Sequence, residues 1–212
     1  MAQVAARPAA SPADDADTDP DVEQAVLALR AGEAIVVPTD TLYGLAALPT
    51  VPGAVDRLFA LKGRPADMPI AVLVAGIEQV ETLAKLPDVA RRLADAFWPG
   101  PLTMVLPRRA GVDLPLGEPH ATIGVRWPDH PVIAALAEAV GPLATTSANR
   151  TGEPTPPTAA EAAASLVGDV AVVLDGGACA GTASTVVDLT GADLRVLREG
   201  GITEAALRAA LD

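Results

Sequence analysis

The chain has 212 residues, half of them hydrophobic, and a formal net charge of −12 at pH 7. This length fits one domain of ordinary size, and the acidic balance argues against a strong, sequence-independent grip on nucleic acid, which needs a basic footprint. No apolar run approaches the roughly 18–20 residues that cross a bilayer, and the single cysteine, Cys179, excludes an internal disulfide and suits a reducing cytoplasm.

The N-terminal stretch differs in composition from the rest of the chain. Residues 1–18 are rich in Ala, Pro, Asp and Ser, so we expect a disordered acidic tail. This stretch also lacks the apolar core of a secretory signal, which favours a cytoplasmic location. The folded domain is then expected over residues 19–212, with Asp19 and Pro20 at the N-cap and first position of a helix that Gly32 ends.

A short buried strand over residues 34–37 leads into the polar loop Pro38-Thr39-Asp40-Thr41. Ligands of α/β proteins bind beyond the C-terminal ends of strands, so the hydroxyls and the carboxylate of this loop are candidates to hold an amino acid or a sugar. A turn that satisfies its own backbone explains the same residues, and spacing alone leaves both interpretations open. An apolar, helix-like run follows.

Two cations, Lys62 and Arg64, stand on either side of Gly63, directly after a predicted helix with Leu58 and Phe59 on its apolar face. Cations so close repel each other, and an anion between them relieves that repulsion. The glycine lets the backbone approach a ligand closely. The pair therefore predicts a phosphate site.

The middle of the chain alternates between strands and helices. Two helical segments are predicted over residues 77–97, separated at Pro87, and strands are predicted at residues 70–74, 102–106 and 122–126. In the loop over residues 107–120 we expect Arg108 and Arg109 to be solvated. Arg126 ends the last of these strands, where solvation at a sheet edge and ligand binding are both open.

A helix is predicted from Pro131 to Val140, with His130 as a surface residue at its start. The histidines have no partners at ligand spacing, so no tightly bound metal is predicted. The next strand, residues 143–145, ends at Ser147 and Asn149. These residues are candidate donors to phosphate or carboxylate oxygens, and a loop of ordinary turn formers is the alternative.

Residues 151–157 form a Pro- and Thr-rich segment that could act as a gate, and Thr158 with Glu161 is a capping box for the following helix. Cys179 has no histidine at triad-like spacing, so we expect it to be inert. Residues 184–189 and 194–197 flank Gly191 and predict a β-hairpin, and Thr203 is expected to cap the last helix.

Polar candidates thus fall at the ends of predicted strands: Thr41, Arg64, Arg126, Ser147, Asn149, Ser184 and Arg198. This pattern predicts one cleft lined with cations and hydroxyls. Neither a Gly-x-x-x-x-Gly-Lys-Ser/Thr loop nor a Gly-x-Gly-x-x-Gly turn is present, and two loop histidines do not make a Ser-His-Asp triad. From the residues alone, the inference stops at an anion or nucleotide cleft in an α/β domain.

Seven motifs occur in the order seen in the YrdC-like family, the L-threonylcarbamoyladenylate synthases, which the chain resembles from about residue 22 to 206. The motifs are Pro38-Thr39-Asp40-Thr41-Leu42-Tyr43-Gly44-Leu45, Lys62-Gly63-Arg64-Pro65, Trp98-Pro99-Gly100-Pro101-Leu102-Thr103, Gly124-Val125-Arg126, Ser147-Ala148-Asn149, Ser184-Thr185-Val186-Val187-Asp188 and Arg198-Glu199-Gly200. Any one of them alone would be weak, whereas their order makes the resemblance specific.

The resemblance implies a twisted mixed α/β sheet, flanked by helices, with a concave basic cleft. It implies a nucleotidyltransferase that makes threonylcarbamoyl-AMP and pyrophosphate from L-threonine, bicarbonate or CO2, and ATP, with Mg²⁺ carried by the ATP. The product serves threonylcarbamoyladenosine modification of tRNA next to the anticodon. The implied partners are tRNA threonylcarbamoyl-transfer proteins, a weak contact with tRNA, and no membrane.

The resemblance also assigns residues. Thr41, Arg126 and Ser184 would hold threonine. The catalytic cations would be Lys62 and Arg64, and the residues that engage ATP would be Lys62, Arg64, Thr122, Ser147, Asn149 and Arg198. Two positions depart from longer relatives, which often have Asn where Met68 stands and His where Leu73 stands. The chain ends soon after the Arg198 motif, so the short, single-domain form is expected.

Two other functions stay open. A non-catalytic RNA-binding module would bind RNA in a salt-dependent way without turnover, and the acidic balance disfavours it. A carbamoyl-transfer accessory domain would act on carbamoyl phosphate, because related domains occur within larger carbamoyltransferases. An assay of pyrophosphate release separates the three.

Overall fold

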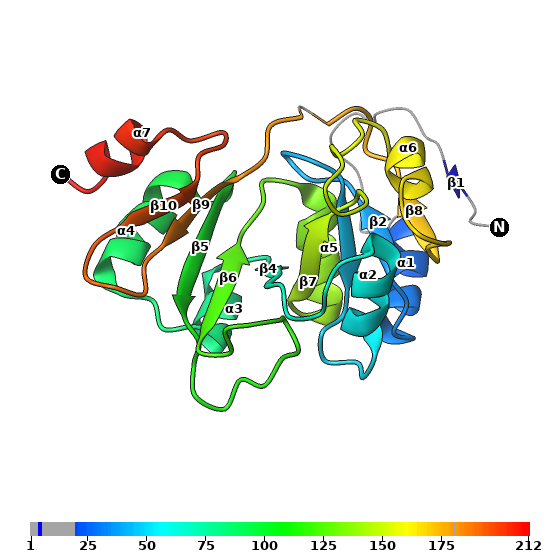
Figure 1. Ribbon diagram of the computed structural model, residues 1–212, viewed down its shortest axis with the longest axis horizontal. Coiled ribbons are helices and arrows are strands. Elements are labelled where there is room, and N and C mark those ends of the chain that lie inside the picture. The colour runs from blue at the N-terminus through cyan, green and yellow to red at the C-terminus, as the bar shows by residue number, and fades with distance from the viewer. Residues whose placement is uncertain (1–3, 6–19, 180) are drawn as a thin grey trace.

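The computed structural model describes residues 4–5, 20–179 and 181–212 (Figure 1). Within these residues one sheet has the strand order β1-β8-β2-β3-β7-β4-β6-β5-β9-β10. The strands are β1 (Val4–Ala5), β2 (Ile35–Val37), β3 (Gly44–Ala47), β4 (Ala71–Leu73), β5 (Leu102–Pro107), β6 (Thr122–Arg126), β7 (Leu143–Ser147), β8 (Val172–Leu174), β9 (Thr185–Asp188) and β10 (Arg195–Arg198). The helices are α1 (Pro20–Arg30), α2 (Ala54–Lys62), α3 (Ile77–Leu83), α4 (Asp88–Phe97), α5 (Pro131–Val140), α6 (Ala159–Ala164) and α7 (Glu204–Ala209).

The sheet is mixed, which confirms the predicted fold class. Parallel pairs join β2 to β8, β4 to β6 and β5 to β9, and antiparallel pairs join β3 to both β2 and β7. The hairpin expected from the C-terminal strands is the antiparallel pair of β9 and β10. Residues 1–3 and 6–18 lie outside the described residues, so the disordered tail stays a prediction there. Val4 and Ala5 depart from it, because they pair with β8.

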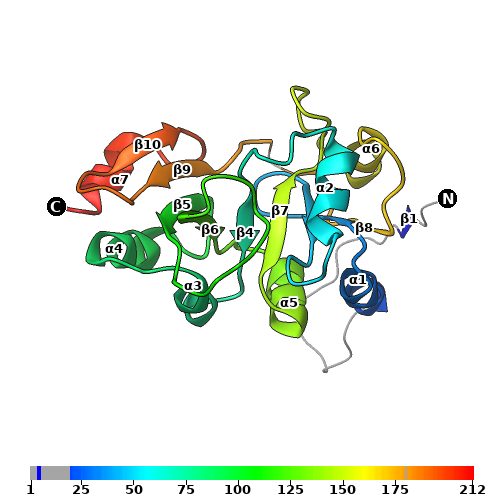
Figure 2. The same ribbon diagram turned by 60° about the horizontal axis from the view of Figure 1, so that its bottom comes forward.

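Helices cover both faces of the sheet. Helices α1 and α5 lie on one side and α2 on the other (Figure 2). Side chains of α1 and α5, such as Leu29 and Ile133, form one core cluster with Ile35 and Val37 of β2. A larger cluster joins α2, α3, α4 and α6 to the alternate strand positions, among them Val36 and Met104. This division follows from the two-residue period of a strand.

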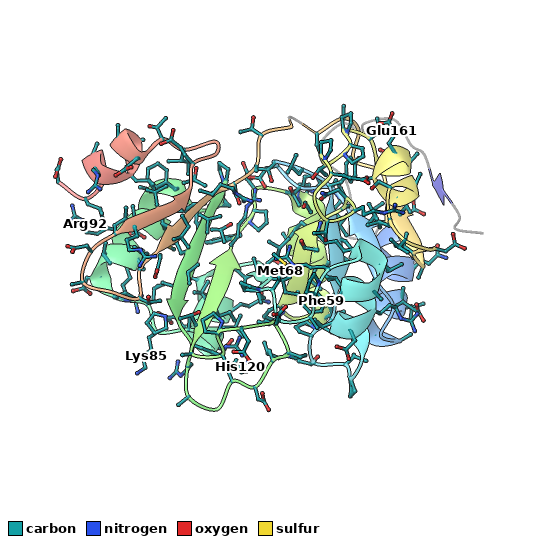
Figure 3. The ribbon with its side chains drawn as sticks, in the orientation of Figure 1. Phe59, Met68, Lys85, Arg92, His120 and Glu161 are labelled. Carbon is teal, nitrogen blue, oxygen red and sulfur yellow. The ribbon has the colours of Figure 1, made fainter. Side chains whose placement is uncertain are left out.

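Caps predicted from the sequence are present. Thr158 Oγ1 accepts a hydrogen bond from the backbone N–H of Glu161 at the start of α6, and Thr203 Oγ1 accepts from the N–H of Ala206 at the start of α7. Close to α7, the Arg92 side chain donates to the carbonyl of Ala210, which ties α4 to the segment after α7 (Figure 3).

The helix-like run before Lys62 is confirmed as α2, but the strand β3 between the polar loop and this helix was not predicted. All four residues of β3 are buried, so it lacks the polar alternation that marks a half-buried strand. Two expectations are wrong. His130 is half-buried, not a surface residue, and its Nδ1 accepts the N–H of Val132 as the cap of α5. Arg108 is half-buried and donates to the carbonyls of Thr122 and Leu114.

Candidate active site

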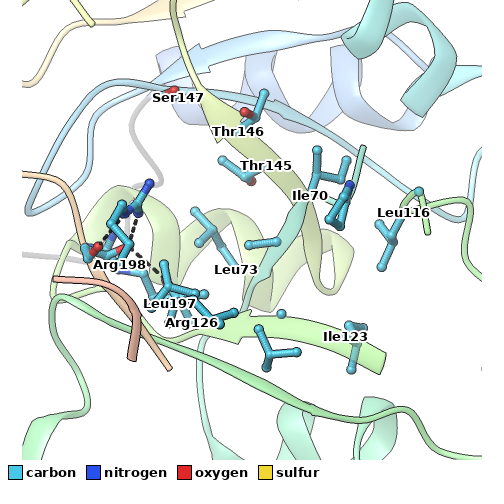
Figure 4. A pocket seen from close by; sticks show the side chains of 18 of the residues that line it. Ile70, Leu73, Leu116, Ile123, Arg126, Thr145, Thr146, Ser147, Leu197 and Arg198 are labelled. Carbon is cyan, nitrogen blue, oxygen red and sulfur yellow. Dashed lines mark hydrogen bonds between the residues drawn. The ribbon is translucent and has the colours of Figure 1, made fainter. Parts of the chain in front are cut away.

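A cavity of about 600 Å³ lies over the strands β7, β4, β6, β5 and β9 (Figure 4). Strand register explains which side chains face it. Ala71 pairs with Gly124 and Leu73 with Arg126, so these four residues share one face of the sheet. Val105 lies opposite Gly124, which places Thr103 and Val105 of β5 on that same face. It is the face that α1 and α5 cover farther along the sheet.

The lining is basic and rich in hydroxyl groups. The arginines among the described lining residues are Arg64, Arg108, Arg126 and Arg198, and the acid is Asp188. The serines and threonines among them are Thr39, Thr41, Thr103, Thr122, Thr145, Thr146, Ser147, Ser184 and Thr190. The cavity is therefore basic although the net charge of the chain is −12. In such a concave site the electric field of the arginines is concentrated and favours an anionic ligand.

Arg126 is the most deeply buried of these cations, with 6% of its surface exposed. Its Nη2 lies 2.5 Å from Asp40 Oδ1, its Nη1 donates to Thr41 Oγ1 at 2.8 Å, and its Nε donates to the carbonyl of Gly100. Burial lowers the pKa of Arg126, and Asp40 opposes that shift. The ion pair thus holds a charged guanidinium beside the Thr41 hydroxyl.

The polar loop over residues 38–41, which contains Asp40, is also a turn. Thr39 Oγ1 accepts the backbone N–H groups of Thr41 and Leu42 and lies 3.0 Å from Thr41 Oγ1. The turn interpretation is confirmed, and ligand binding by this loop stays a prediction. Thr39 satisfies the backbone, and the turn aims Thr41 and Asp40 at Arg126.

A second polar cluster joins β5, the residue directly before β9, and β10. Arg198 donates from Nε to the carbonyl of Ser184 and from Nη2 to its hydroxyl, both at 3.1 Å. The Ser184 hydroxyl lies 2.9 Å from Thr103 Oγ1. Ser184 and Thr103 are each 6% exposed. The guanidinium of Arg198 is thereby held at the cavity wall, and burial lowers its pKa.

Arg64 reaches the cavity from the loop after α2, where Gly63 adopts a left-handed conformation at φ 60°. Its Nη2 donates to the carbonyl of Pro69 at 2.8 Å. Its Nε is buried and has no hydrogen-bond partner among the residues the structure describes. Buried donors are normally paired, so the Arg64 Nε–H is suited to an oxygen supplied by a ligand.

Lys62 is placed differently from its neighbour Arg64. It is 2% exposed and does not line the cavity. Its ammonium donates to the carbonyls of Ser147 at 2.7 Å and Asn149 at 2.8 Å, and to Asn149 Oδ1 at 3.0 Å. Burial first, and then the charge of Arg64, lower the pKa of Lys62 to about 8.

Asn149 is likewise turned into the protein. Its Oδ1 accepts from Lys62 and from Thr155, and its Nδ2 donates to the carbonyls of Arg150 and Glu153. Its side chain therefore has partners at both ends, and it lies behind the cavity wall. Lys62 and Asn149 together hold the backbone that carries Ser147 into the cavity.

The structure thus sorts the predicted site residues into two groups. Seven of them line one cavity, namely Thr41, Arg64, Thr122, Arg126, Ser147, Ser184 and Arg198. Lys62 and Asn149 lie in the layer beneath. Of the two departures from longer relatives, Leu73 lines the cavity, whereas Met68 is 40% exposed and outside the lining (Figure 3).

Sequence reasoning missed several lining residues. Thr103 and Arg108 carry polar groups, and Ile70, Leu116 and Ile123 form an apolar end of the cavity (Figure 4). Thr103 could have been found from the sequence, because it is a polar residue in an otherwise apolar strand. The two-residue period of a strand places it on the face of the sheet away from Leu102 and Met104. Ile70 and Leu116 left none, since apolar residues in a cavity and in a core look alike in sequence.

No group of three His, Cys, Asp or Glu side chains that could hold a metal occurs within residues 4–5, 20–179 and 181–212. Cys179 is half-buried, and burial raises the pKa of its thiol. Over the same residues, no helix is both long and apolar enough to span a bilayer.

Comparison with known proteins gives consistent matches. The family model Sua5_yciO_yrdC, described as "Telomere recombination", matches residues 27–200. A putative threonylcarbamoyl-AMP synthase of Mycobacterium tuberculosis is 46% identical over 185 residues, which cover 86% of this chain and 85% of the relative. The threonylcarbamoyl-AMP synthase of Pyrococcus abyssi is 42% identical over 82% of this chain and 52% of its own length. The chain thus spans about half of that longer relative.

Solved structures agree in fold. The crystal structure of P. abyssi Sua5 complexed with L-threonine superposes with a TM-score of 0.85 at 39% identity, over 90% of this chain and 57% of that one. The crystal structure of E. coli YciO gives a TM-score of 0.81 at 30% identity, over 90% of this chain and 95% of that one.

Proposed function

The chain belongs to the Sua5/YciO/YrdC family, and from this membership we propose that it makes L-threonylcarbamoyladenylate and pyrophosphate from L-threonine, bicarbonate or CO2, and ATP. The observation that carries the proposal is the hydroxyl-rich cavity of about 600 Å³, into which an acidic chain directs Arg64, Arg126 and Arg198. This volume is in the range of sites that hold a cofactor-sized ligand.

The chemistry needs no nucleophile from the protein. The amine of threonine attacks the carbon of CO2, a nitrogen–carbon bond forms, and loss of a proton leaves a carbamate. A carbamate oxygen then attacks the α-phosphorus of ATP, and the bond to the bridging oxygen breaks as pyrophosphate leaves. If bicarbonate is the carbon source, it first loses hydroxide, which takes up the proton released by the amine and leaves as water. Both steps require placement of the reactants and stabilisation of charge on the phosphates.

Arg64, Ser147 and Arg198 are the proposed contacts of the ATP phosphates, because each lines the cavity and has a side chain that can donate a hydrogen bond. The unpaired Nε–H of Arg64 is the strongest of these candidates. Thr122 lies beside the apolar end formed by Ile70, Leu116 and Ile123, which suits a nucleoside. Lys62 and Asn149 do not line the cavity. They would contribute to ATP binding indirectly, because they hold the backbone that places Ser147 in the cavity wall.

Thr41, Arg126 and Ser184 are the proposed contacts of threonine. Arg126 supplies a charge that is fixed by Asp40, and Thr41 and Ser184 supply hydroxyls in the same cavity. A buried guanidinium held in this way pairs well with a carboxylate.

Mg²⁺ belongs to this proposal as part of the substrate, magnesium-ATP. The lining offers cations and hydroxyls with Asp188 as its acid, and the described residues contain no cluster of metal ligands. The phosphates would therefore hold the ion, which neutralises part of their charge.

The proposed setting is the cytoplasm. The adenylate is a reactive mixed anhydride, so it would pass to proteins that transfer the threonylcarbamoyl group to tRNA next to the anticodon. Direct contact with tRNA would be weak, since a chain of net charge −12 repels a polyanion outside its cleft. No membrane partner is proposed.

The test is a pyrophosphate assay in which each substrate is omitted in turn. Release is expected only with L-threonine, bicarbonate and ATP together, and labelled threonine should appear in a nucleotide adduct. Pyrophosphate release from ATP alone, or turnover with carbamoyl phosphate, would contradict the proposal. Tight, salt-dependent RNA binding without any turnover would support the RNA-binding module instead.

A further inference from the structure

Thr103 is a buried hydroxyl with one hydrogen-bond partner in the described part of the chain. Its neighbours in β5, Leu102 and Met104, are fully buried in the core on one face of the sheet. Alternation turns Thr103 to the opposite face, where it lines the cavity with 6% of its surface exposed. Its Oγ1 lies 2.9 Å from the hydroxyl oxygen of Ser184.

The number of hydroxyl protons on Thr103 and Ser184 limits which hydrogen bonds the two residues can make together. A serine hydroxyl has one proton and two lone pairs. One lone pair of Ser184 Oγ accepts from Arg198 Nη2 at 3.1 Å. If Thr103 donates to the other lone pair, Ser184 must direct its own proton elsewhere. The open direction is the cavity, which both residues line.

The reverse order leaves the Thr103 proton free instead, but it is the weaker arrangement. A hydroxyl that accepts two hydrogen bonds becomes a better donor, because each bond polarises the next. Ser184 accepts from a charged guanidinium, whereas Thr103 accepts no hydrogen bond from a charged group in the part of the chain that the structure describes. The ordered chain therefore runs from Thr103 to Ser184 and from Ser184 to a ligand.

The charges around the pair select the ligand atom. Arg198 contacts Ser184 directly, and the charges of Arg126 and Arg198 are close enough to act on each other. The Arg126 guanidinium and a donating hydroxyl, with the charge of Arg198 nearby, fit an anionic oxygen. An acceptor-only carboxylate satisfies both donors, whereas an ammonium group would meet only donors and like charge.

We propose that Thr103 is a positioning residue for the amino-acid substrate, which commits the proton of Ser184 to the substrate carboxylate. The inference rests on the proposed function, since it names how that site recognises threonine. Thr103 acts through Ser184 and does not itself touch the ligand. Thr103 is not among the residues proposed above to contact threonine.

The experiment is a double-mutant cycle on KM for threonine. Thr103→Val keeps the shape of the side chain and removes its proton, so KM for threonine should rise about tenfold, the usual effect of losing one hydrogen bond to a charged group. KM for ATP and kcat at saturating threonine should change less than twofold, because the step from bound substrates is untouched. Thr103→Ser keeps the hydroxyl and should restore KM to within about twofold of wild type.

Non-additivity is the readout that a merely structural role would not produce. Ser184→Ala should raise KM for threonine to a similar extent, and the double variant should be no worse than Ser184→Ala alone. Thr103→Ala, which adds no apolar volume, provides a second route to the same cycle if the valine variant folds poorly. Thr82→Val is the matched control, because Thr82 is exposed on α3 and bonds within its own helix.

Outcomes separate this inference from the proposed function. Wild-type turnover with no effect of Thr103→Val or Thr103→Ala on KM for threonine would overturn the inference alone. Multiplying effects in the double variant would do the same, since Thr103 would then act independently of Ser184. A wild-type protein without threonine-dependent pyrophosphate release would overturn the proposed function itself.

Discussion

The ammonium of Lys62 lies 3.0 Å from the side-chain oxygen of Asn149, although 86 residues separate the two in sequence. The same ammonium donates to the carbonyls of Ser147 and Asn149. Lys62 thus binds protein oxygens, and of these two neighbouring cations it is Arg64 that lines the cavity. Lys62 is a buried cross-link between the end of α2 and the loop after β7.

Replacing Lys62 by Met should destabilise the fold. The change leaves several buried oxygens without a donor, which costs about 2 kcal/mol of unfolding free energy. Urea denaturation measures it. Lys85, the other lysine of the chain, is exposed, and Lys85→Met is the matched control that should leave the midpoint unchanged. Equal midpoints for both variants would show that the cross-link contributes nothing.

The stability that depends on Lys62 should change with pH. Its pKa falls from the ordinary value of 10.5 to about 8 in the folded protein. Between pH 8 and 10 the unfolded chain therefore binds more protons at this lysine than the folded chain, so the unfolding free energy rises with pH. Below pH 8 both states are protonated and the dependence vanishes.

The comparison that isolates this effect is the difference in unfolding free energy between wild type and Lys62→Met. Denaturation in urea at pH 7, 8, 9 and 10 should show the difference growing in favour of the wild type above pH 8, because all other groups are shared. A difference that stays constant over this range would mean that the pKa of Lys62 is not lowered.

Asp40→Asn removes the negative charge of the ion pair with Arg126 and keeps the size of the side chain, so it tests what that charge contributes. Asp40 and Arg126 have side chains 15% and 7% exposed, and removing one partner of a buried pair costs about 3 kcal/mol. The stranded guanidinium should also lose its fixed position, so KM for threonine should rise at least tenfold.

The surface pair of Arg91 and Glu81, whose side chains are 51% and 43% exposed, provides the control for Asp40→Asn. Glu81→Gln should change neither the melting temperature nor KM, because exposed pairs contribute little. Calorimetry and steady-state kinetics on the two variants check both points. A stable, fully active Asp40→Asn protein would contradict the role given to the pair.

Arg64→Ala should affect chemistry far more than folding. Its Nε–H has no partner among the described residues, and its hydrogen bond to the Pro69 carbonyl is exposed, so the protein loses little stability when the side chain is removed. The proposed phosphate contact is lost, and kcat/KM for ATP should fall about 100-fold or more. Arg57→Ala, which removes an exposed arginine of α2 that pairs with Glu33, should keep full activity. Pyrophosphate release at saturating threonine and bicarbonate is the measurement, and normal turnover of Arg64→Ala would refute its assignment.

The sequence by itself determined the local structure and the identity of the motifs. Hydrophobic periodicity located α1, α2, α4 and α5, and the short-range hydroxyl caps at Thr158 and Thr203 needed nothing from elsewhere in the chain. The order of the motifs was enough to indicate the family. These features depend on neighbours within a few positions, which a sequence records directly.

Only the tertiary structure decided how those pieces meet. Strand β3 is buried along its whole length by β2 and β7, and no local period announces it. Which polar residues line the cavity follows from strand register, since a shift of one residue would turn Thr103 and Arg126 into the core. Lys62 and Arg64 are two positions apart but have different surroundings. Lys62 donates to carbonyls at the end of β7 and in the loop after it, whereas Arg64 lines the cavity.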